Sequence, residues 1–156
     1  MKNRFITLAL NNKQMTVREE IIELINKLFI YTDEKKWELL KNEIFADEVF
    51  INMESAGGNA EDLAKEAVCE LFQSVLNNID AVYHLVGNHI LTMVNENYAK
   101  VFCYATASHY HSKAQNGSVR EFVGSYDIEV VKQTEGWKVN TFTYNLKYMN
   151  GNLDLA

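Results

Sequence analysis

The sequence predicts an α+β domain in which N-terminal helices pack on a strongly curved antiparallel sheet that encloses a pocket. Apolar residues recur at helical spacing up to about residue 76, and from residue 81 the hydrophobic period changes to two. Helices followed by a long run of strands are typical of a layered α+β architecture. The chain has 156 residues, a length that suits one domain.

Three helices are predicted in the first half of the chain. Thr16 followed by Glu19 is a capping-box sequence, so the first helix should begin at residue 17. Its apolar face runs through Ile21, Ile25 and Phe29 at helical spacing. A second helix is expected over 34–44, a short strand over 49–52, a Gly-Gly loop over 55–59, and a third helix from Asn59 to about 76.

Four long antiparallel strands are predicted in the second half. Runs rich in Val, Ile, Tyr, Phe and Thr are separated by turn residues such as Asn, Glu and Gly. Strands longer than the usual ~3–10 residues must coil or bend strongly, which predicts the curved sheet. The expected strands are 81–94, 98–112, 118–133 and 137–148.

Composition excludes several classes of function. The formal net charge is −6 and no Lys/Arg run is longer than Lys35-Lys36, so neither a nucleic acid nor an anionic membrane surface is expected as a partner. The apolar run 5–10 is too short for a signal peptide or a membrane span. Cys69 and Cys103 are predicted to be buried, unpaired thiols, which favours a reducing, cytoplasmic location.

The domain limits follow from these patterns. Residues 1–14 are predicted to be an N-terminal extension, 15–150 the folded domain, and 151–156 a C-terminal tail.

The turn at 95–97 brings two histidines together. If Val94 pairs with Ala99, His84 lies directly opposite His109 on the face that the helices cover. Asn88 shares that face and is predicted to contact a ligand. The opposite, outer face is apolar, with Leu91, Phe102 and Tyr104 among its residues. We expect it to be buried in a homodimer or homotrimer.

The two histidines have two interpretations. They are either core histidines that bond to the backbone or to each other, or an acid/base pair, because imidazole changes charge near neutral pH. Asp33 is correspondingly either the N-cap of the second helix or the carboxylate that orients His109. His109 and His111 could hold a metal only with a third ligand, which the sequence does not provide, so neither a metal nor a cofactor is predicted.

Four segments in this order and spacing resemble the SnoaL-like branch of the nuclear transport factor 2-like superfamily, over about residues 15–150. They are Tyr31–Trp37, Phe45–Asp47, His84–Asn88 and Glu135–Val139. The resemblance implies a cone-shaped fold with a pocket inside the cone.

Within that superfamily the polar residues are most similar to those of scytalone dehydratases. This likeness implies that Asp33, His84 and His109 are catalytic and that Asn145 contacts the ligand. Two family tyrosines that act on the substrate carbonyl have no counterpart, because their positions fall on Thr32 and Met53. The substrate-binding set is therefore predicted as Tyr31, Met53, Asn88 and Asn145.

The predicted function is a cofactor-independent lyase or isomerase with dehydratase-like acid/base chemistry on a small, largely apolar, carbonyl-bearing molecule. Two alternatives remain open at this point: a non-catalytic small-molecule-binding or interaction domain of the same fold, and an epoxide or lactone hydrolase.

Overall fold

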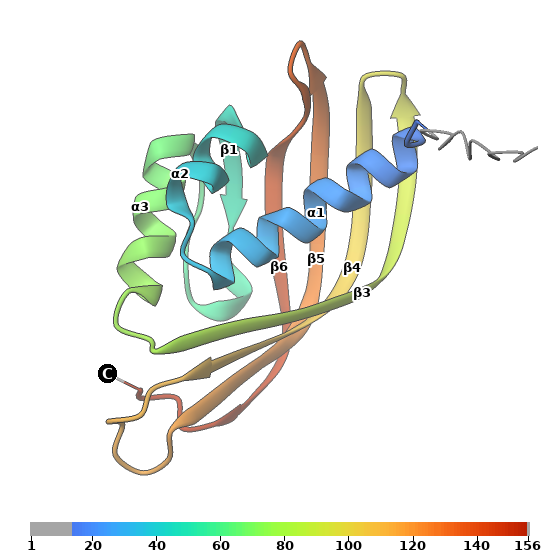
Figure 1. The fold of residues 1–156 in the computed structure, drawn as a ribbon. Helices are drawn as coiled ribbons and strands as arrows, with labels where there is room; N and C mark the ends of the chain where they lie inside the picture. The colour runs from blue at the N-terminus through green and yellow to red at the C-terminus, as the bar shows by residue number, and fades with distance from the viewer. Residues whose placement is uncertain (1–13, 156) are drawn as a thin grey trace, which may run out of the picture.

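A computed structural model describes residues 14–155, which fold as three helices on one face of a six-stranded sheet (Figure 1). The predicted extension 1–14 lies outside the described residues except for its last residue. No helix in the described part is long and apolar enough to cross a membrane. The elements in chain order are α1 (Val17–Asp33), α2 (Trp37–Leu39), a π-helical turn (Leu40–Ile44), β1 (Phe45–Asn52), a 3-10 turn (Glu54–Ala56), β2 (Ala60–Ala64), α3 (Lys65–Leu76), β3 (Ala81–Asn95), β4 (Tyr98–Tyr110), β5 (Val119–Gln133) and β6 (Gly136–Gly151).

Helix α1 begins and packs as its sequence predicts. Glu19 N–H donates to Thr16 Oγ1 at 3.2 Å, and Thr16 N–H donates to Glu19 Oε2 at 2.7 Å, which completes the capping box. The apolar face, with Ile21, Ile25 and Phe29 among its residues, is buried in the main core cluster. The helix ends at Asp33, shortly before the left-handed Lys35 (φ 53°). Figure 1 shows α1 crossing the concave face of the sheet.

Two predicted helices are wrong in part. The segment 34–44 forms only the three-residue α2 and the π-helical turn, and Lys138 Nζ caps this turn by donating to the carbonyls of Asn42 (2.7 Å) and Glu43 (2.9 Å). Residues 60–64 are not helical but form β2, which pairs antiparallel with β1. This pairing satisfies backbone groups that β1 would otherwise leave free at its edge, so tertiary context overrides local helix propensity.

The sheet is mixed rather than purely antiparallel. Its strand order is β2-β1-β6-β5-β4-β3, in which β1 lies parallel to β6 and the other neighbours are antiparallel. The four long hairpin strands were predicted correctly, and they bend around α1 and α3 (Figure 1). The sheet therefore forms an open cone around the core rather than a closed barrel.

The register of the first hairpin differs from the prediction by two residues because the pairing of β3 with β4 shifts at two places. His84 lies opposite Ala107, and His109 lies opposite Val82, so the two histidines share one face but are diagonal neighbours. The register shifts once next to the turn, between Met93 and Asn95, and again at a bulge between Gly87 and Ile90, around Asn88, whose φ is 56°.

Beyond this bulge the two faces of β3 exchange. Ile90 turns outward and is 63% exposed, whereas Leu91, predicted on the outer face, packs against the core. His89, two residues before Leu91 on the strand, has a buried Nε2. The assignment of faces was therefore correct at His84 and wrong beyond residue 88.

The left-handed backbone at Asn88 gives a direct test of the bulge. Asn88→Ala is expected to lower the free energy of unfolding by about 1 kcal/mol, because alanine resists positive φ more than asparagine, whose short polar side chain can hydrogen-bond locally. Asn88→Gly should match or exceed the wild type, since glycine adopts this conformation readily. Urea denaturation of the three proteins measures both effects, and equal stability of the Ala and Gly variants would contradict the interpretation.

The predicted C-terminal tail is largely structured. Strand β6 continues to Gly151, and Leu155 is 1% exposed in a small cluster with Leu76, Ile79 and Val82. The last described residues thus pack against the ends of α3 and β3, at the mouth of the cone near His109.

Candidate active site

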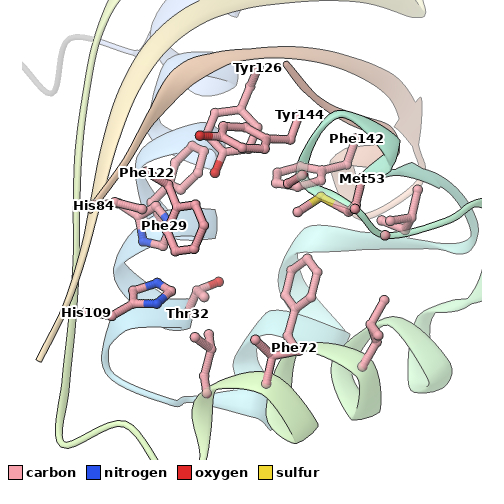
Figure 2. A pocket seen from close by; sticks show the side chains of 18 of the residues that line it. Phe29, Thr32, Met53, Phe72, His84, His109, Phe122, Tyr126, Phe142 and Tyr144 are labelled. Atoms are coloured by element: carbon pink, nitrogen blue, oxygen red, sulfur yellow. The ribbon is translucent and has the colours of Figure 1, made fainter. Parts of the chain in front are cut away.

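A cavity of about 410 Å³ lies between the sheet, α1 and α3 (Figure 2). Most of its lining is apolar and aromatic, and its polar groups are few and come mainly from the sheet. This combination is typical of a site for a small organic molecule. Side chains that line it include Leu28, Phe29, Thr32, Ile51, Met53, Phe72, His84, His109, Arg120, Phe122, Tyr126, Phe142 and Tyr144.

Asp33 holds His84 by two hydrogen bonds. The backbone N–H of His84 donates to Asp33 Oδ2 at 2.8 Å, and the ring Nδ1 lies 2.5 Å from Asp33 Oδ1. Both side chains are largely buried, with exposed fractions of 14% for Asp33 and 9% for His84. Asp33 is the last residue of α1 and His84 lies near the start of β3, so the helix end positions the carboxylate against the strand.

This arrangement assigns the tautomer of His84. A carboxylate only accepts hydrogen bonds, so Nδ1 carries a proton, and in the neutral ring Nε2 keeps its lone pair. The ring of Phe29 packs against the imidazole with a centroid distance of 5.2 Å and limits its rotation. His84 lines the cavity and points into it (Figure 2), so Nε2 is the nitrogen available to accept a proton from a bound molecule.

His109 has the opposite character. Arg120 Nε donates to His109 Nδ1 at 3.0 Å, so the proton of neutral His109 lies on Nε2. Burial, together with the adjacent guanidinium of Arg120, lowers the pKa of His109 from 6.5 to about 4. The side chain is therefore a neutral hydrogen-bond donor at neutral pH and a poor base.

The structure thus pairs Asp33 with His84, whereas the sequence analysis paired it with His109. The carboxylate–histidine pair exists, but the diagonal offset of the two histidines puts His84 next to the end of α1.

The predicted substrate-binding residues are dispersed. Met53 lines the cavity. Tyr31 donates to Glu43 Oε2 at 3.0 Å, and Asn145 Nδ2 donates to Asp127 Oδ2 at 2.7 Å; neither is a lining residue. Asn88 is exposed at the bulge and does not line the cavity either.

Two tyrosines that sequence analysis did not assign to the site lie in the cavity wall. Tyr126 and Tyr144 face each other across β5 and β6 with ring centroids 4.9 Å apart. The hydroxyl of Tyr144 is buried without a hydrogen-bond partner among residues 14–155. Burial raises the pKa of Tyr126 and raises that of Tyr144 to about 12, so both phenols remain neutral hydrogen-bond donors.

No group of three or more His, Cys, Asp or Glu side chains in the described part of the chain is arranged to hold a metal ion. His111 Nδ1 lies 3.5 Å from Asp80 Oδ2, and His111 does not line the cavity. Cys69 and Cys103 are buried free thiols, as predicted.

A helix-covered, cone-shaped sheet with an Asp–His pair facing an apolar cavity defines the class of this protein as an open-cone α+β domain. The chain belongs to the family of SnoaL-like domains, whose sequence pattern matches residues 13–143. This finding confirms the resemblance inferred from the sequence.

Several solved structures share the fold. The Kfla4162 protein from Kribbella flavida superimposes with a TM-score of 0.81 at 23% identity, over 85% of this chain and 92% of that chain. A candidate scytalone dehydratase from Novosphingobium aromaticivorans gives 0.76 at 17% identity, over 86% and 87%. Hexachlorocyclohexane dehydrochlorinase LinA-type3 from Novosphingobium barchaimii gives 0.74 at 17% identity, over 88% and 90%. No curated protein matches the sequence.

Proposed function

We propose that the protein is a cofactor-independent lyase or isomerase that removes a proton next to a carbonyl group of a small, largely apolar molecule. The observation that carries this proposal is the buried Asp33–His84 pair, whose free Nε2 faces a cavity of about 410 Å³. The fold is similar to those of a hexachlorocyclohexane dehydrochlorinase and of a candidate scytalone dehydratase. The names of both proteins describe elimination reactions, which supports an elimination as the class of reaction.

The chemistry follows from the two protonation states. His84 Nε2 takes the proton, the C–H electrons form the C=C bond of an enolate as the carbonyl π electrons move to oxygen, and the positive charge on the imidazole is stabilised by Asp33 through Nδ1–H. In a dehydration the carbonyl then re-forms, the enolate C=C electrons become the new α,β double bond, and the C–O bond breaks with its electrons leaving on the hydroxyl. The imidazolium gives its Nε2 proton to this hydroxyl, which departs as water. In an isomerisation the same proton returns to another carbon. A positioned acid/base group typically contributes about 10²–10⁴-fold to the rate.

The donors around His84 have complementary roles in this proposal. The phenols of Tyr126 and Tyr144 hydrogen-bond to the substrate carbonyl and stabilise the developing enolate. Tyr126 and Tyr144 thus act on the substrate carbonyl in place of the two family tyrosines, whose positions fall on Thr32 and Met53 in this chain. The hydroxyl of Thr32 donates to the Leu28 carbonyl at 2.8 Å and is not free for the substrate.

Deuterium exchange tests the proposal without knowledge of the final product. A panel of apolar β-hydroxy ketones and enones is incubated with the protein in D₂O, and incorporation at the carbon next to the carbonyl is followed by proton NMR. Wild type should catalyse exchange and His84→Gln should not. The matched control is His111→Gln, the same substitution outside the cavity, which should retain exchange.

The possible outcomes distinguish an enzyme from a ligand-binding domain. Exchange that persists in His84→Gln would overturn the assigned base. Binding of panel compounds without exchange in the wild type would indicate a ligand-binding domain instead of an enzyme.

A further inference from the structure

Arg120 is a cation in the wall of a largely apolar cavity. It lies near the start of β5, directly opposite His109 on β4, so both side chains project from the same face of the sheet. Burial lowers the pKa of Arg120, although the guanidinium stays charged at any physiological pH. Arg120 is half-buried, and drawing a charge partly out of water has a cost that an opposite charge or strong hydrogen bonds reduce.

The described part of the chain does not supply an opposite charge. Among residues 14–155 no carboxylate lies within ion-pair distance of Arg120. Glu61, an acidic residue of the cavity lining, accepts from Asn59 Nδ2 at 3.3 Å instead. Asp33, whose carboxylate accepts both hydrogen bonds from His84, is already used there.

The hydrogen-bonding capacity of Arg120 is only partly used. Nε donates to His109 Nδ1 at 3.0 Å, and Nη1 makes one long contact of 3.4 Å with the Leu153 carbonyl. The guanidinium also lies over the ring of Phe122 at 5.4 Å from its centroid. Nη2 has no hydrogen-bond partner among the described residues.

His109 adds a second donor to the same place. Because Arg120 occupies Nδ1, the Nε2–H of His109 is fixed as a donor, and no hydrogen bond within residues 14–155 uses it. A guanidinium and a neutral imidazole N–H, side by side in the cavity wall, match the two oxygens of a carboxylate.

We propose that Arg120 and His109 bind a carboxylate group of the ligand. The conclusion that this ligand is the substrate rests on the proposed function, whereas binding of a carboxylate can be measured without catalysis. The carboxylate neutralises Arg120 at this end of the cavity. The carbon skeleton extends past His84 along the apolar wall toward Tyr126 and Tyr144, which bind a carbonyl. The substrate class is therefore an apolar carboxylic acid that carries a second carbonyl group.

A matched pair of ligands tests the carboxylate site. 4-Phenylbutyrate and its neutral analogue 4-phenylbutanamide have nearly the same shape and differ in the charged group. Both are titrated by NMR, with the Arg120 Nε–H and the histidine ring signals as reporters. Charge-assisted hydrogen bonds lead us to expect that the wild type binds the acid at least tenfold more tightly than the amide.

Two variants test whether Arg120 causes the preference for the acid over the amide. Arg120→Gln removes the charge but keeps a polar side chain, and it should bind the acid and the amide about equally. Arg18→Gln is the matched control, because Arg18 contacts the His89 carbonyl at 3.4 Å and does not line the cavity. It should keep the wild-type preference.

Three results would overturn the proposal: equal affinity of the wild type for acid and amide, a preference for the acid that survives in Arg120→Gln, and the absence of any acid-dependent shift at Arg120 and His109. Failure of the proposed function is distinguishable from these. A protein that binds the acid at Arg120 but exchanges no α-proton retains the carboxylate site and loses only the catalytic role.

Discussion

Replacing Asp33 by asparagine is expected to slow α-proton exchange by about 10²- to 10⁴-fold, the typical contribution of a positioned acid/base group. Asp33 accepts two hydrogen bonds from His84, one from the backbone N–H and one from the ring Nδ1–H. Asparagine has one acceptor oxygen and one donor amide group. The backbone N–H of His84 can only donate, so it hydrogen-bonds to the asparagine oxygen. The NH₂ group of the asparagine then faces the imidazole ring.

The consequence is a change of tautomer rather than a loss of fold. An amide that donates to Nδ1 drives the ring proton to Nε2, and the nitrogen that faces the cavity then has no lone pair with which to accept a proton. Nitrogen NMR of the histidine rings reports this exchange directly and needs no substrate. Glu34→Gln, the same acid-to-amide change at the exposed neighbouring residue, should leave both tautomer and exchange rate unaltered. An unchanged His84 tautomer in Asp33→Asn would contradict the assigned pair.

The sequence predicted which residues form the site better than it predicted which of them hydrogen-bond to each other. Asp33, His84 and His109 all lie at or next to the cavity, because helix ends and strand parity are encoded locally in the hydrophobic pattern. Which histidine meets Asp33 depends on the register of β3 against β4. That register is set by a shift next to the turn, between Met93 and Asn95, and by a bulge at Asn88, an exposed residue whose sequence context gives no hydrophobic signal.

Arg120 and the two tyrosines were missed for a different reason. All three lie on the inner face of β5 or β6. The face on which Arg120 lies depends on the register across the turn between β4 and β5, which the sequence does not fix, and a lone arginine near a strand end is ordinarily a solvent-exposed residue. The same limit applies to β2, since the sequence of residues 60–64 favours a helix and only its pairing with β1 makes it a strand.

The buried His109 also predicts how the stability of the protein responds to acid. Its native pKa of about 4 lies below the ordinary value of 6.5, chiefly through burial and secondarily through the charge of Arg120, with a smaller effect of His84 and an opposing effect of Asp33. Between these two pH values the unfolded chain binds the proton and the native state does not. The contribution of His109 to stability is therefore complete above pH 6.5 and is lost as the pH falls toward 4.

The expected size of this effect is about 2 kcal/mol between pH 7 and pH 5, from about 1.4 kcal/mol per pKa unit over that window. Several carboxylates with lowered pKa values, Asp80 and Glu129 among them, also destabilise the protein in acid. The free energy of unfolding is therefore measured by urea denaturation at both pH values, for the wild type and for His109→Gln, and the losses of the two proteins are compared. The carboxylate contributions cancel, and the wild type should lose about 2 kcal/mol more than the variant. Equal losses would mean that His109 titrates in the native state as it does in the unfolded chain. Its neutral Nε2–H donor, on which the binding of a carboxylate beside Arg120 depends, would then be replaced by a charged imidazolium at mildly acidic pH.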